Sequence, residues 1–402
     1  MSATERSPLR VGLVCYPTFG GSGVVAAELG RMLAQRGHEV HFICHNIPAR
    51  LTPLPSGIQF HLVDVVSYPL LEFPPYTLAL ACAIYDVHEQ HDLDIVHVHY
   101  AVPHATAAYL ALDMTRHPPG IRGGVAAEAS GGGRRPFPIV TTLHGTDIEL
   151  LGRDPSYHTI TAWSLQRSAA VTAVSSFLAQ RTAREVIDVP IEVIPNFVDP
   201  DAFSPKSLPH LRALFASDDQ PLICHISNLR GIKRIDDLIA FFLRLRRHVD
   251  CKLMVVGEGP DRERAFQRVN EAGVIGDVHF VGFTPFVQQY LQISDLFVLT
   301  SDMESFGLAV LEAMACAVPV VAYGVGGVPE VVGECGCASL VARGDLDTLA
   351  AAALHYLSDP AAAAAAGSAG RQRALGYFRA DVIVSRYEEL YYRLVRRRAG
   401  DA

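Results

Sequence analysis

Short apolar runs rich in β-branched residues alternate with helical patterns along nearly the whole 402-residue chain. In the first half, the runs typical of strands are residues 11–15, 40–43, 58–63, 95–99, 139–143, 171–174 and 191–194. Stretches of helical periodicity, such as 22–35 and 76–91, separate them. Strands that alternate with helices of about 10–15 residues predict a parallel sheet with helices on both faces. The first half is therefore predicted to be a doubly wound, Rossmann-like α/β domain.

A proline-rich segment interrupts this alternation near residue 200. Residues 195–209 contain four prolines with turn-forming residues between them, which is typical of a linker. The alternation then restarts, with predicted strands at 222–226, 253–256, 278–281, 296–299, 319–322 and 340–341. We therefore predict an N-terminal domain over 1–200 and a second Rossmann-like domain over 201–378. The remaining residues, 379–402, are expected to form a helix that packs back on the N-terminal domain, with Tyr387, Leu390, Tyr391 and Leu394 on one stripe.

Composition excludes several classes of protein. The net charge of -8 and the pI of about 6.1 argue against a protein that binds nucleic acid or an anionic membrane. No apolar stretch reaches the roughly 18 residues of a membrane span, and residues 1–10 lack the pattern of a signal peptide. We expect a cytoplasmic protein without integral membrane association. A Gly- and Arg-rich stretch at about 118–136 is expected to be a mobile insertion in the first domain.

The eight cysteines do not form a pattern of metal ligands. Most of them sit inside apolar runs and are expected to be buried free thiols in a reducing compartment. Cys335 and Cys337 form a C-x-C pair without a second pair at zinc spacing, so thiols in a loop or at a strand end are favoured over a metal site.

A glycine-rich turn follows the first predicted strand. Residues 19–23 read Phe-Gly-Gly-Ser-Gly and lead directly into the helix predicted at 22–35. A helix N-terminus presents free N–H groups and a positive dipole end, which favour an anion. The alternative is a plain tight turn with Ser22 as the N-cap. Because the spacing is not G-x-G-x-x-G, a dinucleotide cofactor is disfavoured.

A second candidate is the segment 304–312, which follows the predicted strand at 296–299. Ligands bind at the carboxyl ends of strands in open sheets. If Phe306 starts the helix, the N–H groups of residues 306–308 point at one spot that suits a phosphate. Glu304 in the loop and Glu312 in the helix could accept hydrogen bonds from different parts of one sugar nucleotide. The alternative is a capping acid and a surface glutamate.

The basic turn at 228–234, Asn-Leu-Arg-Gly-Ile-Lys-Arg, follows the first strand of the second domain. Arg230 and Lys233 could together hold a diphosphate. The alternative is a solvated turn without a ligand. Because residues 228–234 lie at a strand's carboxyl end, the ligand role and the purely structural role are equally favoured.

The histidines and paired aspartates of the sequence do not form a convincing set of metal ligands. His97 and His99 share one face of a predicted strand, with Tyr100 and His104 following, but no third ligand is evident. The D-x-D patterns at 92–94 and 345–347 are interpreted as structural, the second as a helix N-cap. The sequence therefore predicts no metal site.

These segments together resemble a known family. Residues 304–312 match the E-x7-E signature of the retaining glycosyltransferases of family 4. Residues 15–23, 99–104, 141–147 and 194–197 are similar to the branch of that family that transfers N-acetylglucosamine from UDP-N-acetylglucosamine to L-malate, the first step of bacillithiol biosynthesis. The resemblance extends over nearly the whole chain. It implies a GT-B fold, in which two Rossmann-like domains face a central cleft.

The resemblance also implies roles for individual residues. Arg230 and Lys233 would hold the diphosphate, and no cofactor or metal is expected. The implied catalytic residues are Arg230, Lys233, Glu304 and His144. The implied donor-binding residues are Gly21, Asn228, Arg230, Lys233, Gly257, Glu304, Ser305, Phe306, Gly307, Leu308 and Glu312. The implied acceptor-binding residues are Gly20, Ser22, Tyr100, Thr142, His144 and Asn196.

Three alternatives stay open at this point. The first is another family 4 enzyme with a different acceptor. The second is a UDP-N-acetylglucosamine epimerase, which shares the two-domain fold and would consume the donor without malate. The third is a catalytically silent sensor of nucleotide sugars. The oligomeric state is also open, a homo-oligomer included.

Overall fold

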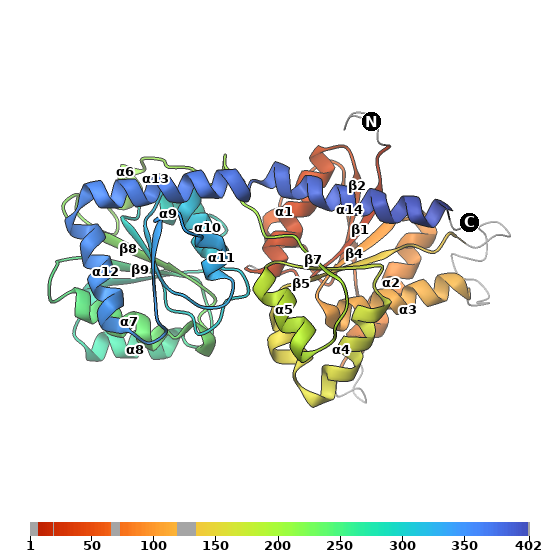
Figure 1. The fold of residues 1–402 in the computed structure, drawn as a ribbon, viewed down its shortest axis with the longest axis horizontal. Coiled ribbons are helices and arrows are strands. Elements are labelled where there is room, and N and C mark those ends of the chain that lie inside the picture. Colours follow the sequence, from red (N-terminus) through yellow and green to blue (C-terminus); the bar gives the residue numbers. More distant parts are fainter. Residues whose placement is uncertain (1–6, 19, 66–72, 119–133, 401–402) are drawn as a thin grey trace. The chain divides into compact units, whose positions relative to one another are not determined.

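The computed structural model describes residues 7–18, 20–65, 73–118 and 134–400 (Figure 1). The chain divides into two compact units, Met1–Ile194 with Ile383–Ala402, and Pro195–Val382. Most of the insertion expected at about 118–136 lies outside the described residues, as does Phe19 of the glycine-rich turn. Each unit is a parallel sheet with helices on both faces, as predicted from the alternating pattern.

The first unit contains, among its described residues, a seven-stranded sheet in the order β3-β2-β1-β4-β5-β6-β7. All of its paired strands are parallel. The central strands β4 and β5 are fully buried, which explains their nearly continuous apolar sequences. The strands are β1 (Arg10–Val14), β2 (Glu39–Cys44), β3 (Ile58–Leu62), β4 (Ile95–His99), β5 (Ile139–Leu143), β6 (Ala170–Ala173) and β7 (Ile191–Val193).

Helices cover both faces of this sheet. Helices α2 and α3 pack on the face that carries Val14, Ile43 and Val98. Helix α1 lies on the opposite face, where Gly30 approaches Leu13 and Phe42 closely. The helical segments are α1 (Ser22–Gln35), η2 (Ala49–Leu51), α2 (Tyr76–His91), η3 (Ala101–Ala105), α3 (Thr106–Arg116), η5 (Asp147–Gly152), α4 (Pro155–Arg167), α5 (Ser176–Glu185) and most of α14 (Ala380–Gly400).

The second unit repeats this plan with a six-stranded parallel sheet in the order β10-β9-β8-β11-β12-β13. Its core includes the stripe Leu238, Phe241, Phe242 and Leu245 of α7. The strands are β8 (Leu222–Ile226), β9 (Lys252–Val256), β10 (Val278–Gly282), β11 (Leu296–Leu299), β12 (Val320–Tyr323) and β13 (Ala338–Val341). The helical segments are α6 (Pro209–Arg212), η6 (Gly231–Lys233), α7 (Ile235–Leu245), α8 (Arg262–Glu271), η7 (Ile275–Asp277), α9 (Val287–Gln292), α10 (Leu308–Ala315), α11 (Val328–Val332), α12 (Leu346–Ser358) and α13 (Pro360–Tyr377).

Strand order locates the place where each unit can bind a ligand. In both sheets the chain winds outward in one direction, returns to the middle and winds outward in the other. This reversal falls between β1 and β4 in the first unit and between β8 and β11 in the second. Open α/β sheets bind ligands at the carboxyl ends of the strands that flank such a switch point. The loops after β1, β4, β8 and β11 are therefore the first places to examine.

Helix α14 is anchored on the first unit by buried tyrosines. The hydroxyl oxygen of Tyr391 lies 2.6 Å from Nδ1 of His97, and the ring of Tyr387 packs 5.3 Å from the same imidazole. Glu388 forms ion pairs with Arg36 and His38 at the end of α1. The apolar stripe recognised in the sequence thus faces the sheet.

The cysteines follow the prediction with one correction. Five of them are buried and unbridged, namely Cys15, Cys44, Cys224, Cys251 and Cys316. Cys335 and Cys337, expected to be separate thiols, instead form a disulfide across Gly336, whose φ of 66° turns the backbone sharply. Within the ranges described above, no helix combines the length and apolar character needed to cross a membrane.

Candidate functional site

The loops after β8 and β11 meet at the switch point of the second unit. Nζ of Lys233 lies 2.6 Å from Oε1 of Glu304, so the structure pairs two residues that the sequence placed 71 positions apart. Ser301 donates a hydrogen bond to the same carboxylate oxygen at 2.7 Å. The side chains of Lys233 and Glu304 are 17% and 15% exposed, so a ligand can reach both.

The helix that follows Glu304 begins later than the sequence suggested. Phe306 was expected to start it, but α10 begins at Leu308, and Gly307 is its N-cap with φ 97° and ψ 51°. The reason is that this left-handed backbone conformation is open to glycine and cannot be part of an α-helix. The N–H groups without intrahelical acceptors are therefore those of residues 308–310, and no side chain caps them. An anion at this end would be stabilised by the helix dipole.

Glycines let the neighbouring loops pack against this site. A Cβ on Gly257, which has φ 124°, would lie 1.9 Å from the carbonyl oxygen of Ser227. A Cβ on Gly326 would lie 1.8 Å from the carbonyl oxygen of Glu304, which also accepts a hydrogen bond from the N–H of Gly327 at 2.8 Å. Gly257 was singled out from the sequence, whereas Gly326 and Gly327 were missed. Their signal was the cluster of three glycines at 324–327, directly after a buried strand.

The other donor residues fall in the same two loops or in the helix after them. Asn228 and Arg230 are exposed in the loop after β8. Asn228 lies five residues before Lys233, and Arg230 lies three residues before it. Ser305 is half-buried beside Glu304. Glu312 is only 6% exposed on α10, among apolar neighbours, which removes the alternative of a surface glutamate.

A second helix N-terminus lies at the switch point of the first unit. Helix α1 begins at Ser22, and its N-cap is Gly21 with φ 58°. The predicted alternative of a Ser22 N-cap is therefore wrong, because Gly21 takes that position and no side chain caps the helix. A Cβ on Gly23 would lie 2.5 Å from the carbonyl oxygen of Tyr16, so the turn requires glycine there. Gly20 is exposed in the same turn and Ser22 is buried.

Histidines line the ends of β4 and β5 as a hydrogen-bonded network rather than a metal site. Nδ1 of His99 lies 2.9 Å from Nε2 of His144. Nε2 of His97 lies 2.6 Å from the hydroxyl oxygen of Thr142, and Nδ1 of His104 lies 2.6 Å from the carbonyl oxygen of His99. Burial lowers the pKa of His97 and of His144 to about 3 and that of His104 to about 4, so these rings are neutral at pH 7.

Asp147 holds the loop that carries His144. Its Oδ1 accepts hydrogen bonds from the N–H groups of Gly145 at 2.8 Å and His144 at 3.2 Å, and its Oδ2 accepts one from Ala101 at 3.3 Å. Burial raises the pKa of Asp147 to about 6, and these donors partly oppose the shift. A single buried carboxylate thus ties together the loops after β4 and β5, a role that the sequence did not reveal.

The remaining acceptor candidates differ in their placement. Tyr100 has a positive φ of 105° and its N–H donates to the carbonyl oxygen of Thr142 at 3.0 Å. The ring of Tyr100 lies 5.7 Å from that of His144. The hydroxyl of Thr142 is fully buried between His97 and Thr172, so it holds His97 in place and is not exposed to a ligand. Asn196 is buried and belongs to the second unit, whereas the other acceptor candidates belong to the first.

Comparison with known proteins gives the family. The model of the family described as Glycosyltransferase Family 4 matches residues 19–202, and that described as Glycosyl transferases group 1 matches residues 210–373. The chain is 40% identical over 390 residues to N-acetyl-alpha-D-glucosaminyl L-malate synthase from Bacillus anthracis, an alignment that covers 96% of this chain and 98% of that one.

Solved structures give the fold. Sucrose-phosphate synthase from Thermosynechococcus elongatus superposes with a TM-score of 0.77 at 22% identity, over 96% of this chain and 99% of that chain. Anabaena HepE, in complex with UDP and glucose, superposes with a TM-score of 0.76 at 18% identity, over 95% and 99%. The predicted α/β architecture is confirmed as the two-domain GT-B fold, and the chain belongs to the family 4 glycosyltransferases.

Proposed function

We propose that this glycosyltransferase transfers N-acetylglucosamine from UDP-N-acetylglucosamine to the hydroxyl of L-malate, with retention of the anomeric configuration. The observation that carries the proposal is the 40% identity with the malate synthase over almost the full length of both chains. The loops at both switch points support it, because each offers an uncapped helix N-terminus to an anionic ligand.

The donor is assigned to the second unit. Arg230 and Lys233 hold the diphosphate, together with the free N–H groups at the start of α10. Glu304 accepts hydrogen bonds from the sugar hydroxyls once the diphosphate draws Lys233 toward itself. Glu312, buried one turn into α10, accepts from the ribose hydroxyls. In this proposal, one carboxylate binds the sugar and the other binds the ribose, on opposite sides of the diphosphate.

The acceptor is assigned to the first unit. Malate is a dianion, and the N-terminus of α1 at Ser22 is suited to a carboxylate by its free N–H groups and its dipole. Tyr100 and His144, whose rings lie 5.7 Å apart, supply donors on the neighbouring strand ends. A neutral imidazole carries one N–H, so the ring nitrogen of His144 that does not face His99 can donate a hydrogen bond to a malate oxygen.

The chemistry follows from these assignments. The bond between the anomeric carbon and the β-phosphate oxygen breaks, and the malate oxygen bonds to that carbon on the same face. The proton of the malate hydroxyl passes to the departing β-phosphate, so no protein base is required. Catalysis then depends on stabilising the charge of the leaving UDP, which Lys233, Arg230 and the α10 N-terminus supply without a metal.

The test is the release of UDP from UDP-N-acetylglucosamine by purified protein in the presence of a chelator, with and without L-malate. Malate-dependent release supports the proposal, and its persistence with chelator supports metal-independent transfer. Consumption of the donor without malate would point to an epimerase or a hydrolase. Donor binding without turnover would instead require a screen of other hydroxylated acceptors.

A further inference from the structure

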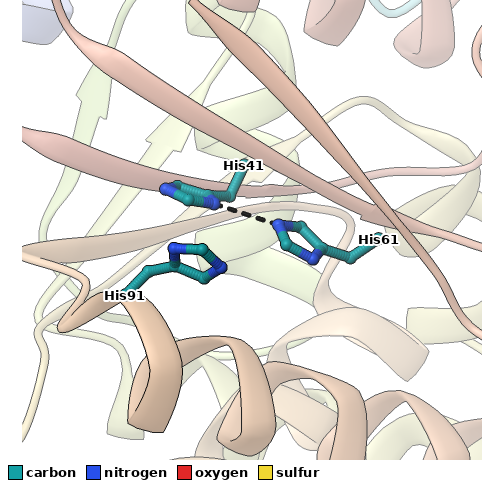
Figure 2. Close-up of side chains that lie close together, drawn as sticks. All are labelled: His41, His61 and His91. Carbon is teal, nitrogen blue, oxygen red and sulfur yellow. Dashed lines mark hydrogen bonds between the residues drawn. The ribbon is translucent and has the colours of Figure 1, made fainter.

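Three histidines of the first unit, away from the residues assigned to transfer, have their ring nitrogens turned toward one another (Figure 2). His41 lies on β2, His61 on the neighbouring β3, and His91 at the end of α2. One nitrogen of each ring lies within 4.8 Å of the others. We propose that His41, His61 and His91 form a binding site for one divalent transition-metal ion of the zinc type.

The fold itself brings these residues together. Ile43 of β2 is paired with His61 of β3 and belongs to the core cluster under α2 and α3. Because side chains alternate along a strand, His41 shares the face of Ile43. Helix α2 covers this face, and its last residue, His91, is the third member of the cluster. The site would therefore join the edge strand β3 and its neighbour β2 to the helix that packs on them.

The spacing of the nitrogens is close to what a metal needs. Nδ1 of His41 lies 3.0 Å from Nε2 of His61. Nitrogen ligands at about 2.0–2.1 Å from a tetrahedral zinc ion are about 3.3 Å apart. The ring centroids of His41 and His91 are 4.4 Å apart, and a rotation of the half-buried His91 brings its nitrogen to the same point. Three imidazoles would leave the fourth position to water.

The second nitrogen of His41 supplies independent support. His41 is fully buried, and its Nε2 makes no hydrogen bond, although Oε1 of Glu39 lies 3.3 Å away. A metal on Nδ1 would leave the proton on Nε2, facing that carboxylate. Metal-bound histidines commonly donate their other N–H to a carboxylate in this way. The ion would thus fix the tautomer in which the buried Nε2 of His41 carries its proton toward Glu39.

Charge and protonation around the cluster favour a cation. Arg10 is the nearby positive group that acts on His41, and it is paired with Asp92 at 3.0 Å and Asp94 at 3.2 Å. With Glu39, the surrounding carboxylates outnumber this one guanidinium. Histidine binds metals as the neutral imidazole, the form that predominates at pH 7 for an unperturbed side chain.

The experiment uses full-length protein without a histidine tag, stripped of metal with a chelator and titrated with Zn²⁺ or Co²⁺. We expect one equivalent to bind, visible d–d absorption typical of tetrahedral Co²⁺, and a thermal midpoint raised by about 5 °C or more at saturating Zn²⁺. His91→Ala and, separately, His61→Ala should weaken Zn²⁺ affinity by at least about 100-fold, beyond the effect of losing an outer hydrogen-bond partner. His117→Ala, at an exposed position of the same unit, is the matched control and should bind like the wild type.

Each outcome decides the question independently of the proposed transfer. Loss of the Co²⁺ spectrum and of the thermal shift in the His91 and His61 variants, with both retained in His117→Ala, supports the site whether or not the protein releases UDP in the presence of malate. Absence of one-equivalent binding in the wild type would overturn it. Binding that survives both substitutions would overturn it as well, because other groups would then be the ligands.

Discussion

The Lys233–Glu304 pair permits a sharp test of the donor site. We predict that Lys233→Ala leaves the protein folded and nearly abolishes transfer. In the absence of donor, the substitution removes one ion pair of 2.6 Å between side chains that are 17% and 15% exposed. Loss of such a partly buried pair should cost about 1–3 kcal/mol, between the value for an exposed pair and that for a fully buried one. Glu304 also keeps the hydrogen bond from Ser301.

The effect on turnover should be much larger. In the transition state of the proposed transfer the β-phosphate of the leaving UDP gains negative charge, and Lys233 is the cation that we propose to lie beside it. Removal of one preorganised donor to a developing negative charge typically costs about 100- to 1,000-fold in kcat, or about 2.7–4 kcal/mol. We therefore expect a loss of that size in malate-dependent UDP release, measured at saturating UDP-N-acetylglucosamine and L-malate.

Lys252 provides a matched control in the same unit. Its Nζ lies 2.7 Å from Asp277, and both side chains are 18% exposed, so the pair is equivalent in length and burial. Lys252 begins β9, at the amino end of the sheet, whereas Lys233 follows the carboxyl end of β8. Lys252→Ala should lose similar stability and keep wild-type turnover. Equal turnover in the two variants would refute the donor assignment.

Three further predictions concern packing and pH. Gly326→Ala should lower both stability and kcat, because its Cβ would lie 1.8 Å from the carbonyl oxygen of Glu304. Gly273 is the control, because it also has a positive φ but lies in open space. Gly273→Ala should lower the free energy of unfolding only by the backbone strain of about 1–2 kcal/mol and leave kcat unchanged. Tyr391→Phe should lower the free energy of unfolding by about 1–3 kcal/mol, because it leaves a buried imidazole nitrogen unpaired. Tyr392→Phe removes only a hydrogen bond at the exposed surface, to the carbonyl oxygen of Ser7, and should change the free energy of unfolding by less than about 0.5 kcal/mol in the same urea titration. A reversed order would contradict this account of α14. Lowering the pH from 7.5 to 5.5 should destabilise the protein. Burial lowers the pKa of five histidines, His41, His97, His104, His144 and His225, to about 3 or 4, while the unfolded chain takes up protons below the usual histidine pKa of about 6.5. Each contributes about 1.4 kcal/mol at pH 5.5, so an unchanged urea midpoint would be inconsistent with neutral buried rings.

Much of the architecture could be predicted from the sequence because it depends on local patterns. Apolar runs of four to six residues alternate with helical stripes, and parallel strands buried on both faces have little choice in composition. The positions of Glu304 and Lys233 at strand carboxyl ends could be derived in the same way. Their contact with each other was not predicted, because it joins two loops 71 residues apart.

Features that depend on backbone conformation or on long-range contact could not be predicted. Gly307 ends up in a left-handed conformation, which moved the start of α10 by two residues from the expected position. Asp147 reads as an ordinary polar residue after a strand, yet it is fully buried and accepts from three backbone N–H groups of two loops. Such roles depend on which loops the strand order brings together.

The histidines show the same division between sequence and tertiary structure. His97 and His99 stand two residues apart, so they could be weighed as ligands from the sequence, but the fold engages them with Thr142, Tyr391 and His144. His41, His61 and a third histidine 30 residues further along carry no local spacing that suggests a site. The pairing of the edge strand β3 with β2, together with the end of α2, placed their nitrogens close to one another. The sequence determined the two α/β domains and the residues at their strand ends, because hydrophobic periodicity is local; the contacts among those residues were decided by tertiary packing, because they join segments distant along the chain.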